Sequence, residues 1–446
     1  MNTVLVANRG EIARRVFRAC RRLGLRTVAV YSEADKDALH VRDADQAVLL
    51  GPAPARDSYL DVERLLDAAR RSGADAVHPG YGFLSENWRF AEACARAGLT
   101  FIGPPAEAVR AMGDKTEARR LMAAAGVPTV PGSPGPIADA TEAVTVAGRV
   151  GFPLVLKAAG GGGGIGMARV DRAPDLAAAF ATATRRAQSA FGNPAVYIER
   201  YLERPRHVEV QIFADAHGCV VHLHERECSI QRRHQKLMEE SPAPNLAAAT
   251  KRGLTEAAVA GARAIGYVNA GTMEFLVDAA GSFYFLEMNT RIQVEHPVTE
   301  EVTGLDLVVE QLRVAAGERL SWPQEAIVQR GAAIEVRVYA EDPDKNFLPS
   351  PGTIARLEVP AGDRLRVESG VESGSVVPVH YDPLLFKLIA AGAERAEALA
   401  RLRAALEATV VEGVRSTVPF LRKVLDHPDV RRGVLHTQMV DQGAFR

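Results

Sequence analysis

The chain of 446 residues is poor in several features that would identify a function at once. Its four cysteines, Cys20, Cys94, Cys219 and Cys228, show no spacing typical of a metal site or a redox pair, so we expect buried structural thiols. No apolar run is long enough to cross a membrane. The formal net charge of -1 argues against a surface that binds nucleic acid or a membrane.

The beginning of the chain lacks the pattern of a secretory signal. A predicted strand at Thr3–Ala7 starts almost at once and leaves no room for such a signal. Scattered cysteines without disulfide spacing are typical of proteins in a reducing compartment. We therefore expect a cytoplasmic protein.

Two glycine motifs of nucleotide-binding folds are also missing. The first predicted strand is followed by Asn8-Arg9-Gly10-Glu11 instead of Gly-x-Gly-x-x-Gly, which argues against a dinucleotide site. The glycines at Gly160–Gly164 join two predicted strands, Phe152–Lys157 and Met167–Val170, and lack the Gly-Lys-Ser/Thr ending of a P-loop. A glycine-rich segment still exposes backbone amides to phosphate oxygens, so we interpret it as a nucleotide lid.

Lysine is scarce, because only 8 of the 54 basic residues are lysines. A lysine retained in such a chain is more often needed as a compact point charge. Lys115, Lys157 and Lys236 each stand in a motif-like context. The last of these ends the segment Arg232–Lys236, whose cationic groups favour an anion site, although a solvated loop fits the same pattern.

The length and the pattern of apolar residues predict three parts. Strands and helices alternate over residues 1–113, which indicates an open, mostly parallel α/β domain. A loop rich in proline and glycine at Pro128–Pro136 marks a hinge in the second part, residues 114–330. Residues 331–446 combine short strands at about 333–339, 352–357 and 376–380 with a helix over Arg395–Val410, which is typical of an α+β domain. The apolar stripe of this helix, Leu399, Leu402, Leu406 and Val410, is expected to pack on a core.

The richest segment for chemistry runs from Glu287 to His296. If it is an extended strand, one face carries two carboxylates, two amides and a guanidinium, while the other face is apolar. The polar residues are Glu287, Asn289, Arg291, Gln293 and Glu295. A solvated strand face fits the same alternation, so a second observation is needed to decide.

A predicted hairpin supplies that observation. If Asp278 pairs with Phe283 around a four-residue loop, Glu274 lies directly opposite Glu287. Like charges that face each other across a strand pair are destabilising, so a cation is expected between them. Carboxylate oxygens are the ligands that magnesium prefers, and the sequence therefore predicts a divalent metal at this pair.

Several of these segments together resemble the biotin carboxylase family of ATP-grasp enzymes. The resemblance extends from residue 8 to about residue 350 and rests on motifs of up to eleven residues. They are Asn8–Ala13, His78–Asn87, Met112–Lys115, Arg206–Glu209, Gln231–Lys236, Glu287–Pro297, Ala340–Pro343 and Phe347–Gly352. It implies an N-terminal α/β domain, an ATP-grasp domain with a mobile lid at about 130–203, and a C-terminal biotin carboxylase domain.

The resemblance also implies a reaction. ATP would activate bicarbonate as carboxyphosphate, which carboxylates biotin in the first half-reaction of an enzyme such as acetyl-CoA carboxylase. Glu274, Glu287 and Asn289 would bind Mg²⁺ or Mn²⁺. The residues implied for ATP are Lys115, Lys157, Gly161, Gly162, Gly163, Gly164, Glu199, Arg200, Leu202, His207, Gln231 and His234, together with Glu274 and Glu287.

The same resemblance assigns the carboxylation site. Lys236, Arg291, Gln293 and the Val294 backbone would hold bicarbonate, and Glu295, confined by Arg291 and Arg337, would act as the general base. The fixed charge of Arg337 would stabilise the biotin enolate. Tyr81 would help to seat the biotin ring.

The chain departs from the family pattern at two positions. Ile165 follows the glycines where the family generally has a cation, which predicts an altered contact between lid and nucleotide. Arg200 stands where the family often has lysine, so charge is kept but geometry differs.

The chain contains no Ala-Met-Lys-Met segment, the signature of a biotinylated carrier. We therefore expect biotin to arrive on a separate carrier protein or domain, and a carboxyltransferase subunit to select the final acceptor. The family also implies a homodimer.

Two alternatives remain at this stage. Another ATP-grasp ligase would share Lys115, Lys157, Glu274 and Glu287 but has no need for Arg337 or the polar residues at 291–295. A non-catalytic homologue that only binds ligands has Ile165 as its one support.

Overall fold

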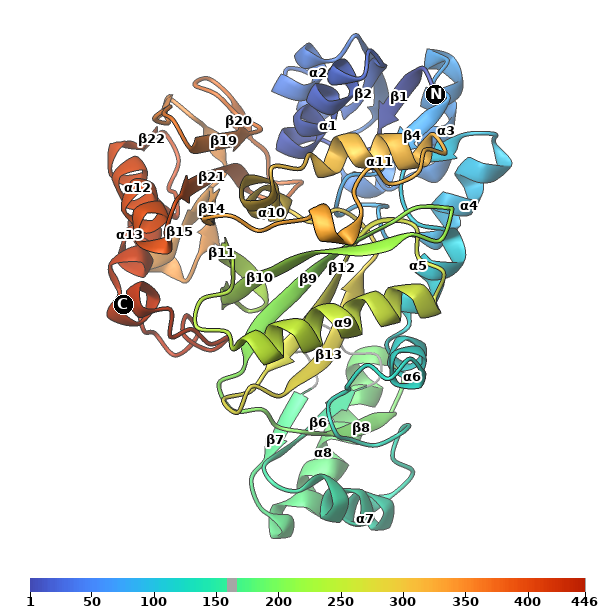
Figure 1. Cartoon of the computed structure of the whole chain (residues 1–446), viewed down its shortest axis with the longest axis vertical. Coiled ribbons are helices and arrows are strands. Elements are labelled where there is room, and N and C mark those ends of the chain that lie inside the picture. Colours follow the sequence, from blue (N-terminus) through green and yellow to red (C-terminus); the bar gives the residue numbers. More distant parts are fainter. Residues whose placement is uncertain (159–166, 446) are drawn as a thin grey trace.

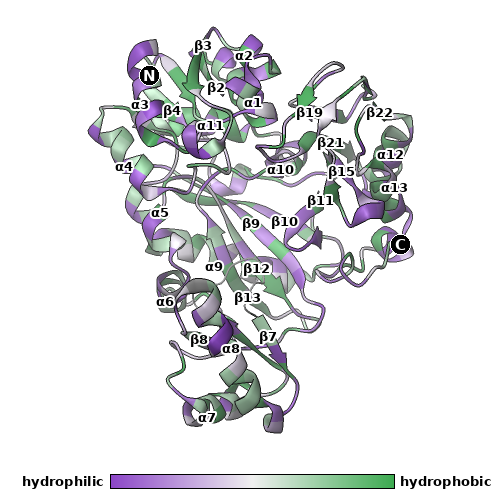
Figure 2. Ribbon diagram, turned by 180° about the vertical axis from the view of Figure 1, so that it is seen from behind, coloured by the Kyte–Doolittle hydropathy of each residue, from purple (hydrophilic) through white to green (hydrophobic). Residues whose placement is uncertain are grey.

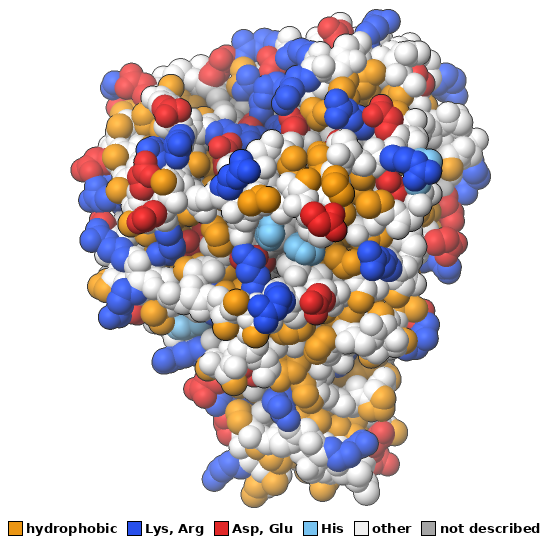
Figure 3. All heavy atoms as spheres, viewed as in Figure 1, with side chains coloured by type: hydrophobic (Ala, Val, Ile, Leu, Met, Phe, Trp, Pro, Cys, Tyr) orange, Lys and Arg blue, Asp and Glu red, His pale blue; other side chains and the backbone are white. Residues whose placement is uncertain are grey.

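The computed structural model describes residues 1–158 and 167–445 of the chain. An N-terminal α/β unit lies at the top of Figure 1, a large sheet passes through the centre, and a small lobe of strands and helices forms the lower end. Charged side chains of both signs are interspersed over the face shown in Figure 3. Among the described helices, none combines the length and the apolar character needed to cross a membrane.

The N-terminal unit is a five-stranded sheet in which all strands are parallel, as the sequence predicts. Its order is β3 (Gln46–Gly51), β2 (Arg26–Ser32), β1 (Thr3–Val6), β4 (Ala76–His78) and β5 (Thr100–Phe101). Helix α1 (Gly10–Arg22) packs on one face, and α3 (Val62–Ser72) and α4 (Trp88–Arg96) pack on the other. All four residues of β1 are buried, because the sheet is covered on both sides.

The central sheet has eight antiparallel strands and carries seven of the candidate residues, which are His207, Gln231, Lys236, Glu274, Glu287, Asn289 and Arg337. Its order is β13 (Phe283–Asn289), β12 (Asn269–Val277), β9 (Arg206–Ala214), β10 (Val220–Arg232), β11 (Gln235–Ser241), β14 (Ala332–Tyr339), β21 (Leu384–Gly392) and β19 (Leu365–Ser369). The pairing of β11 with β14 carries the sheet across residue 330 into the C-terminal part. Helix α9 (Ala248–Ala264) covers one face of the sheet (Figure 1).

The lower lobe contains a separate three-stranded sheet with the order β7 (Met167–Val170), β6 (Leu154–Ala158) and β8 (Val196–Arg200). Helices α7 (Ala140–Val150) and α8 (Leu176–Phe191) complete its own apolar core. Strands β6 and β7 are antiparallel and flank the glycine segment, which agrees with the predicted strand-to-strand connection. Gly160–Gly164 and Ile165 themselves lie outside the described residues.

The C-terminal part corrects three predicted elements. Helix α12 (Arg395–Ala408) buries Leu399, Leu402 and Leu406 as expected, but Val410 belongs to the following strand β22 (Val410–Glu412). The predicted strand over 352–357 is divided into β17 (Gly352–Thr353) and β18 (Arg356–Glu358), and only Val376–Val377 of the segment 376–380 is a strand.

The cysteines largely follow expectation, because all four are free and Cys20, Cys94 and Cys228 are buried. Cys219 is the exception, being only half-buried at the turn between β9 and β10.

Candidate active site

The site begins with the alternation of side chains on β9. Val208, Val210 and Ile212 point toward α9 and join its apolar core. The opposite face carries His207, Glu209 and Gln211. Hydrophilic and hydrophobic stretches accordingly both occur along the strands of the central sheet (Figure 2). His207, Glu209 and Gln211 are all buried. Because buried polar groups require partners, this face is not a solvated strand surface.

The predicted opposition of Glu274 and Glu287 is confirmed, although the predicted turn is wrong. Phe283 pairs with Val277 and not with Asp278, so the connecting loop is one residue longer than expected. A β-bulge at Leu286 shifts the strand pairing by one residue, so that Phe275 faces Phe285 whereas Glu274 faces Glu287, as predicted.

The polar stripe does not continue as a strand to Glu295. Strand β13 ends at Asn289, and Thr290–Glu295 turns into helix α10 (His296–Thr303). The stripe prediction failed here because strand alternation was extended beyond the last residue that pairs with β12. The turn nevertheless brings Gln293 back to the strands, where its Nε2 donates a hydrogen bond to Glu274 Oε1 at 2.9 Å.

Lys236 lies at the centre of the polar face, with its ammonium group bonded to three carboxylates. The Nζ–oxygen distances are 2.6 Å to Glu209, 2.8 Å to Glu274 and 2.7 Å to Glu295. Burial alone would lower the pKa of Lys236, but the three carboxylates hold it well above its usual value. Lys236 is therefore part of a buried ion cluster, whereas Arg233 and His234, in the turn between β10 and β11, are exposed.

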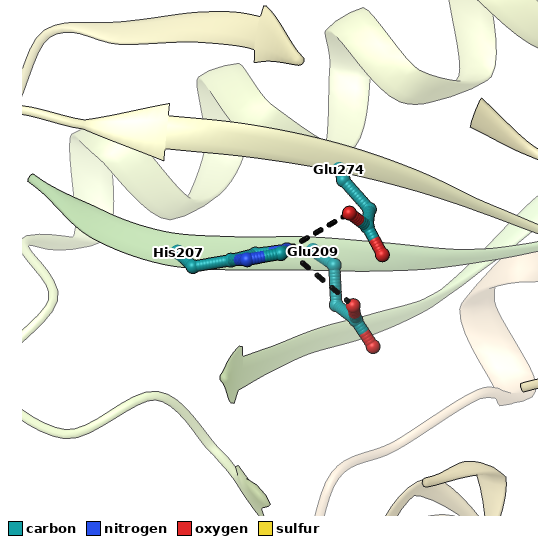
Figure 4. Close-up of side chains that lie close together, drawn as sticks. All are labelled: His207, Glu209 and Glu274. Atoms are coloured by element: carbon teal, nitrogen blue, oxygen red, sulfur yellow. Dashed lines mark ion pairs between the residues drawn. The ribbon is translucent and has the colours of Figure 1, made fainter. Parts of the chain in front are cut away.

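His207 extends this cluster, as Figure 4 shows. Its Nε2 lies 3.1 Å from Glu274 and 3.9 Å from Glu209. Burial disfavours the charged ring, but Glu274 raises the pKa of His207 above its usual value. The ligand atoms of the three residues lie within 4.8 Å of one another, and the cation that Glu209 and Glu274 share is the Lys236 ammonium.

Arg226 supports the cluster from the neighbouring strand and was missed by the sequence analysis. Its guanidinium is fully buried and donates five hydrogen bonds, of which Nε to Glu209 is 2.6 Å and Nη2 to Gln293 is 2.7 Å. The other acceptors are Gln211, Thr299 and Thr272. Arg226 and Glu209 are direct partners in the pairing of β10 with β9, so a cross-strand charge pair was the available signal.

Glu274 and Glu287 differ strongly in their surroundings. Glu274 accepts hydrogen bonds from Lys236, Gln293 and, at 2.8 Å, Asn289. Burial opposes its ionisation, but Lys236 and then His207 hold the pKa of Glu274 well below its usual value. Burial and the charge of Glu274 raise the pKa of Glu287 instead. Because the ionised form of Glu287 is disfavoured in this way, a divalent cation bound beside it would stabilise its charge.

Glu295 lies between Lys236 and Arg337, whose Nη2 donates to Glu295 Oε2 at 2.9 Å. Burial alone would raise the pKa of Glu295, but Lys236 and Arg337 hold it well below its usual range. The same guanidinium donates from Nε to Glu239 at 2.6 Å, a partner that the sequence analysis did not identify.

Arg291 makes no direct bond to Glu295, but the two groups interact: burial opposes the charge of Arg291, whereas Glu86 and then Glu295 raise its pKa above the usual value. Its Nε donates to Glu86 at 3.0 Å and its Nη2 donates to Asn289 Oδ1 at 2.8 Å. The second cation at Glu295 is Lys236 instead. Arg291 is in the turn after β13, where the side chain no longer follows strand alternation, and its direct partners are therefore Glu86 and Asn289.

Tyr81 reaches the same region from the N-terminal unit. Its hydroxyl donates to Glu11, and Glu11 lies 3.1 Å from Lys387 Nζ. The Lys387 ammonium also donates to the Val294 carbonyl oxygen at 2.6 Å. Burial, followed by the charge of Glu11, raises the pKa of Tyr81 well above its usual value, and nearby Arg337 opposes the shift.

The residues predicted for the nucleotide lie between the central sheet and the lower lobe. Gln231 Nε2 is 3.1 Å from His207 Nδ1. Burial lowers the pKa of His234, and the charges of His207, Lys115 and Lys157 lower it further. These five predicted residues therefore meet in one region, at the base of the lobe.

Glu199 on β8 has two cationic partners, Lys157 on β6 and Arg119 on α6 (Lys115–Ala124). Arg119 was not anticipated. The Arg200 side chain bonds instead to the end of α7, where its Nε donates to the Val150 carbonyl oxygen at 3.3 Å. The predicted residues Gly161–Gly164 lie outside the described part of the chain, and the half-buried Leu202 follows β8 directly.

Family models match the chain in three places. Residues 1–109 match "Biotin carboxylase, N-terminal domain" and residues 335–442 match "Biotin carboxylase C-terminal domain". Residues 114–322 match "Carbamoyl-phosphate synthase L chain, ATP binding domain". The chain belongs to the biotin carboxylase family.

Curated relatives agree over nearly the whole chain. A protein of Halalkalibacterium halodurans named biotin carboxylase is 52% identical over 437 residues, which cover 98% of this chain and 96% of the relative. One of the pyruvate carboxylase subunits of Methanothermobacter thermautotrophicus is 52% identical over 440 residues, covering 98% of this chain and 89% of the relative.

A solved structure agrees as well. It is the biotin carboxylase domain dimer of Hydrogenobacter thermophilus 2-oxoglutarate carboxylase, in complex with MgADP, ADP and bicarbonate. It has 46% sequence identity and a TM-score of 0.92, and the match covers 100% of this chain and 98% of that chain.

The family, the ATP-grasp fold class and the enzyme class predicted from the sequence are thus confirmed. The chain is a biotin carboxylase, a ligase that couples ATP to the carboxylation of biotin by bicarbonate. Its cofactors are ATP, a divalent metal such as magnesium, and biotin.

Proposed function

We propose that the residues around Glu295 form the centre where this biotin carboxylase activates bicarbonate and carboxylates biotin. The observation that carries the proposal is the position of Glu295 between two buried cations, Lys236 and Arg337. A substrate anion and a negatively charged enolate both require such fixed positive charge.

Glu295 is the proposed general base. Its carboxylate is ionised throughout the physiological range, because Lys236 and Arg337 hold its pKa far down. A base of low pKa is effective only when it touches the proton that it removes. Bicarbonate is therefore proposed to bind in the turn before Glu295, against Arg291, Gln293, the Val294 backbone and Lys236.

Arg337 and Tyr81 are proposed to receive biotin. Arg337 is anchored on one side by Glu239 and on the other by Glu295, which fixes the direction of its guanidinium. The charge of Arg337 acts on the Tyr81 hydroxyl, so the two side chains are close enough to serve one ligand.

Glu274, Glu287 and Asn289 are the proposed metal ligands. When bound, the metal neutralises charge on the transferred phosphoryl group. Glu287 is the residue in greatest need of a cation, since burial and Glu274 both raise its pKa. Manganese, with the same preference for oxygen ligands, is proposed as an alternative to magnesium.

The proposed nucleotide site lies between the lower lobe and the central sheet. The charges of Lys115 and Lys157 lower the pKa of His234 there, in addition to the effect of burial. His207 and Gln231, which lie 3.1 Å apart, border the same region. Glu199, Arg200 and Leu202 at the end of β8 are proposed to lie near the adenine. We further propose that the chain is divided into domains at residues 1–113, 114–330 and 331–446. Within the second of these, residues 130–203 are proposed to act as a lid over the nucleotide.

The partners are proposed from the relatives. The similar 2-oxoglutarate carboxylase domain is a dimer, and we propose a homodimer here. A biotin carboxyl carrier and a carboxyltransferase complete the enzyme. The acceptor is proposed to be acetyl-CoA, propionyl-CoA, another acyl-CoA or pyruvate. Four free thiols support a cytoplasmic location.

The test uses the unmodified chain with MgATP, with and without bicarbonate and free biotin. We expect ADP release to require bicarbonate, and carboxybiotin to form only when biotin is added. ADP release that is indifferent to bicarbonate would assign the site to another ATP-grasp reaction. Loss of ADP release altogether would favour a protein that only binds ligands.

A further inference from the structure

Two buried acidic residues beside Arg337 face each other across a strand pair. Glu239 on β11 and Glu335 on β14 are direct partners in the antiparallel register, and both are fully buried. Direct partners on one face of a sheet lie about 4.5–5.5 Å apart at their Cβ atoms, where two like charges destabilise the pair. Burial strengthens that repulsion, so one of the two carboxyls must be neutral.

The hydrogen bonds indicate which one is neutral. Burial raises the pKa of Glu239 to about 7, but Arg337 opposes this shift, and its Nε donates a hydrogen bond to Glu239 Oε1 at 2.6 Å, which favours Glu239 as the ionised member of the pair. Within the described residues, Glu239 Oε2 and both carboxyl oxygens of Glu335 have no hydrogen-bond partner. A proton on Glu335 resolves both difficulties, because a carboxylic acid donates a hydrogen bond to Glu239 Oε2.

The charged groups around Glu335 are already engaged. From β21, Lys387 donates to a backbone carbonyl oxygen at 2.6 Å and lies 3.1 Å from Glu11. From α10, His296 Nδ1 is 2.7 Å from another backbone carbonyl oxygen, and burial holds the pKa of His296 well below its usual value, so the ring is neutral; its Nε2 has no hydrogen-bond partner within the described residues.

The groups on the remaining sides of Glu335 are also either engaged with other partners or apolar. Glu295 is bonded to Lys236 and Arg337, and α12 packs on the other face of β14 through apolar side chains. Burial raises the pKa of Glu335 well above its usual value; Lys387 opposes this shift and Glu239 adds to it.

We propose that Glu335 is a positioning residue for biotin carboxylation: it carries a proton, donates a hydrogen bond to Glu239, and so fixes the carboxylate that orients Arg337. The inference rests on the proposed role of Arg337. Because Glu335 acts through Glu239 and Arg337, its loss affects the carboxylation of biotin more than the cleavage of ATP.

Two substitutions of similar size test the proposal. Glu335→Gln is neutral and keeps a hydrogen-bond donor for Glu239, so we expect carboxybiotin formation within about threefold of the parent. Glu335→Leu is neutral without a donor, and we expect carboxylation to fall about tenfold, the effect of one lost hydrogen bond. Bicarbonate-dependent ADP release is expected to stay within about threefold in both.

Infrared difference spectroscopy supplies a readout independent of activity. At about pH 8, far above the ordinary pKa of glutamate, the parent should show the C=O stretch of a protonated carboxyl, and Glu335→Gln should lose it. Persistence of that band, parental carboxylation in Glu335→Leu, or an equal fall of both half-reactions would overturn the proposal. A parent that forms no carboxybiotin would contradict the proposed function instead, while the band would still report the proton on Glu335.

Discussion

Replacing Lys236 by Met removes the ammonium group that Glu209, Glu274 and Glu295 share, while keeping a side chain of similar length. Breaking a buried ion pair by removing one partner costs about 3–5 kcal/mol. Each carboxylate retains another cationic neighbour, since Arg226 bonds to Glu209, His207 lies beside Glu274, and Arg337 bonds to Glu295. We therefore expect a loss at the lower end of that range, about 3 kcal/mol.

This loss should be visible in thermal unfolding. The entropy of unfolding is about 2.1 cal/mol/K per residue, so 446 residues that unfold together convert about 3 kcal/mol into a Tm decrease of roughly 3 °C. Calorimetry at neutral pH measures it. Lys36→Met is the matched control, because Lys36 is exposed and its contact with exposed Asp37 is 4.0 Å long; its Tm should equal that of the parent.

The loss of stability in Lys236→Met, relative to the parent, should also become smaller as the pH falls. In the parent, Glu274 and Glu295 have depressed pKa values, so their contribution to stability is present above the unfolded pKa and lost as pH falls through the folded one. Without Lys236, burial favours the protonated forms of Glu274 and Glu295, and proton uptake relieves their repulsion as the pH falls. An unchanged Tm at neutral pH, or a deficit that persists in acid, would refute the reasoning.

Two further substitutions give separate tests. Glu287→Gln should reduce magnesium-dependent ATP cleavage at least about 100-fold, measured as ADP release, because the proposed metal loses a charged ligand; full activity would show the metal assignment to be wrong. Arg226→Lys should lower the free energy of unfolding by at least about 2 kcal/mol in calorimetry, because three donors cannot serve five buried acceptors, and a parental Tm would contradict that account.

The parts of the fold that follow local patterns were predictable from the sequence. Parallel strands β1 to β5 and the helices between them depend on runs of apolar residues, and these runs are visible without the structure. The end of α12 and the division of segment 352–357 were not, because both depend on pairing between β18 and β22, which are distant in the chain.

The site shows the same limit more sharply. The opposition of Glu274 and Glu287 was predicted with a turn that is one residue too short, and only the bulge at Leu286 made the result correct. A bulge is set by neighbouring strands and leaves no clear trace in one sequence. Arg226 was missed for a related reason, since its five acceptors come from four separate segments of the chain.

The central claim is that Arg337 serves biotin whereas Glu295 serves bicarbonate, and paired assays of ADP release and carboxybiotin formation test it most directly. Removing one preorganised charge typically costs about 10²–10³ in rate. Arg337→Ala should therefore lose carboxylation to this extent and keep some bicarbonate-dependent ADP release, whereas Glu295→Ala should lose both, because bicarbonate that keeps its proton is a poor nucleophile. Carboxylation of free biotin by Arg337→Ala at the parental rate would contradict the account.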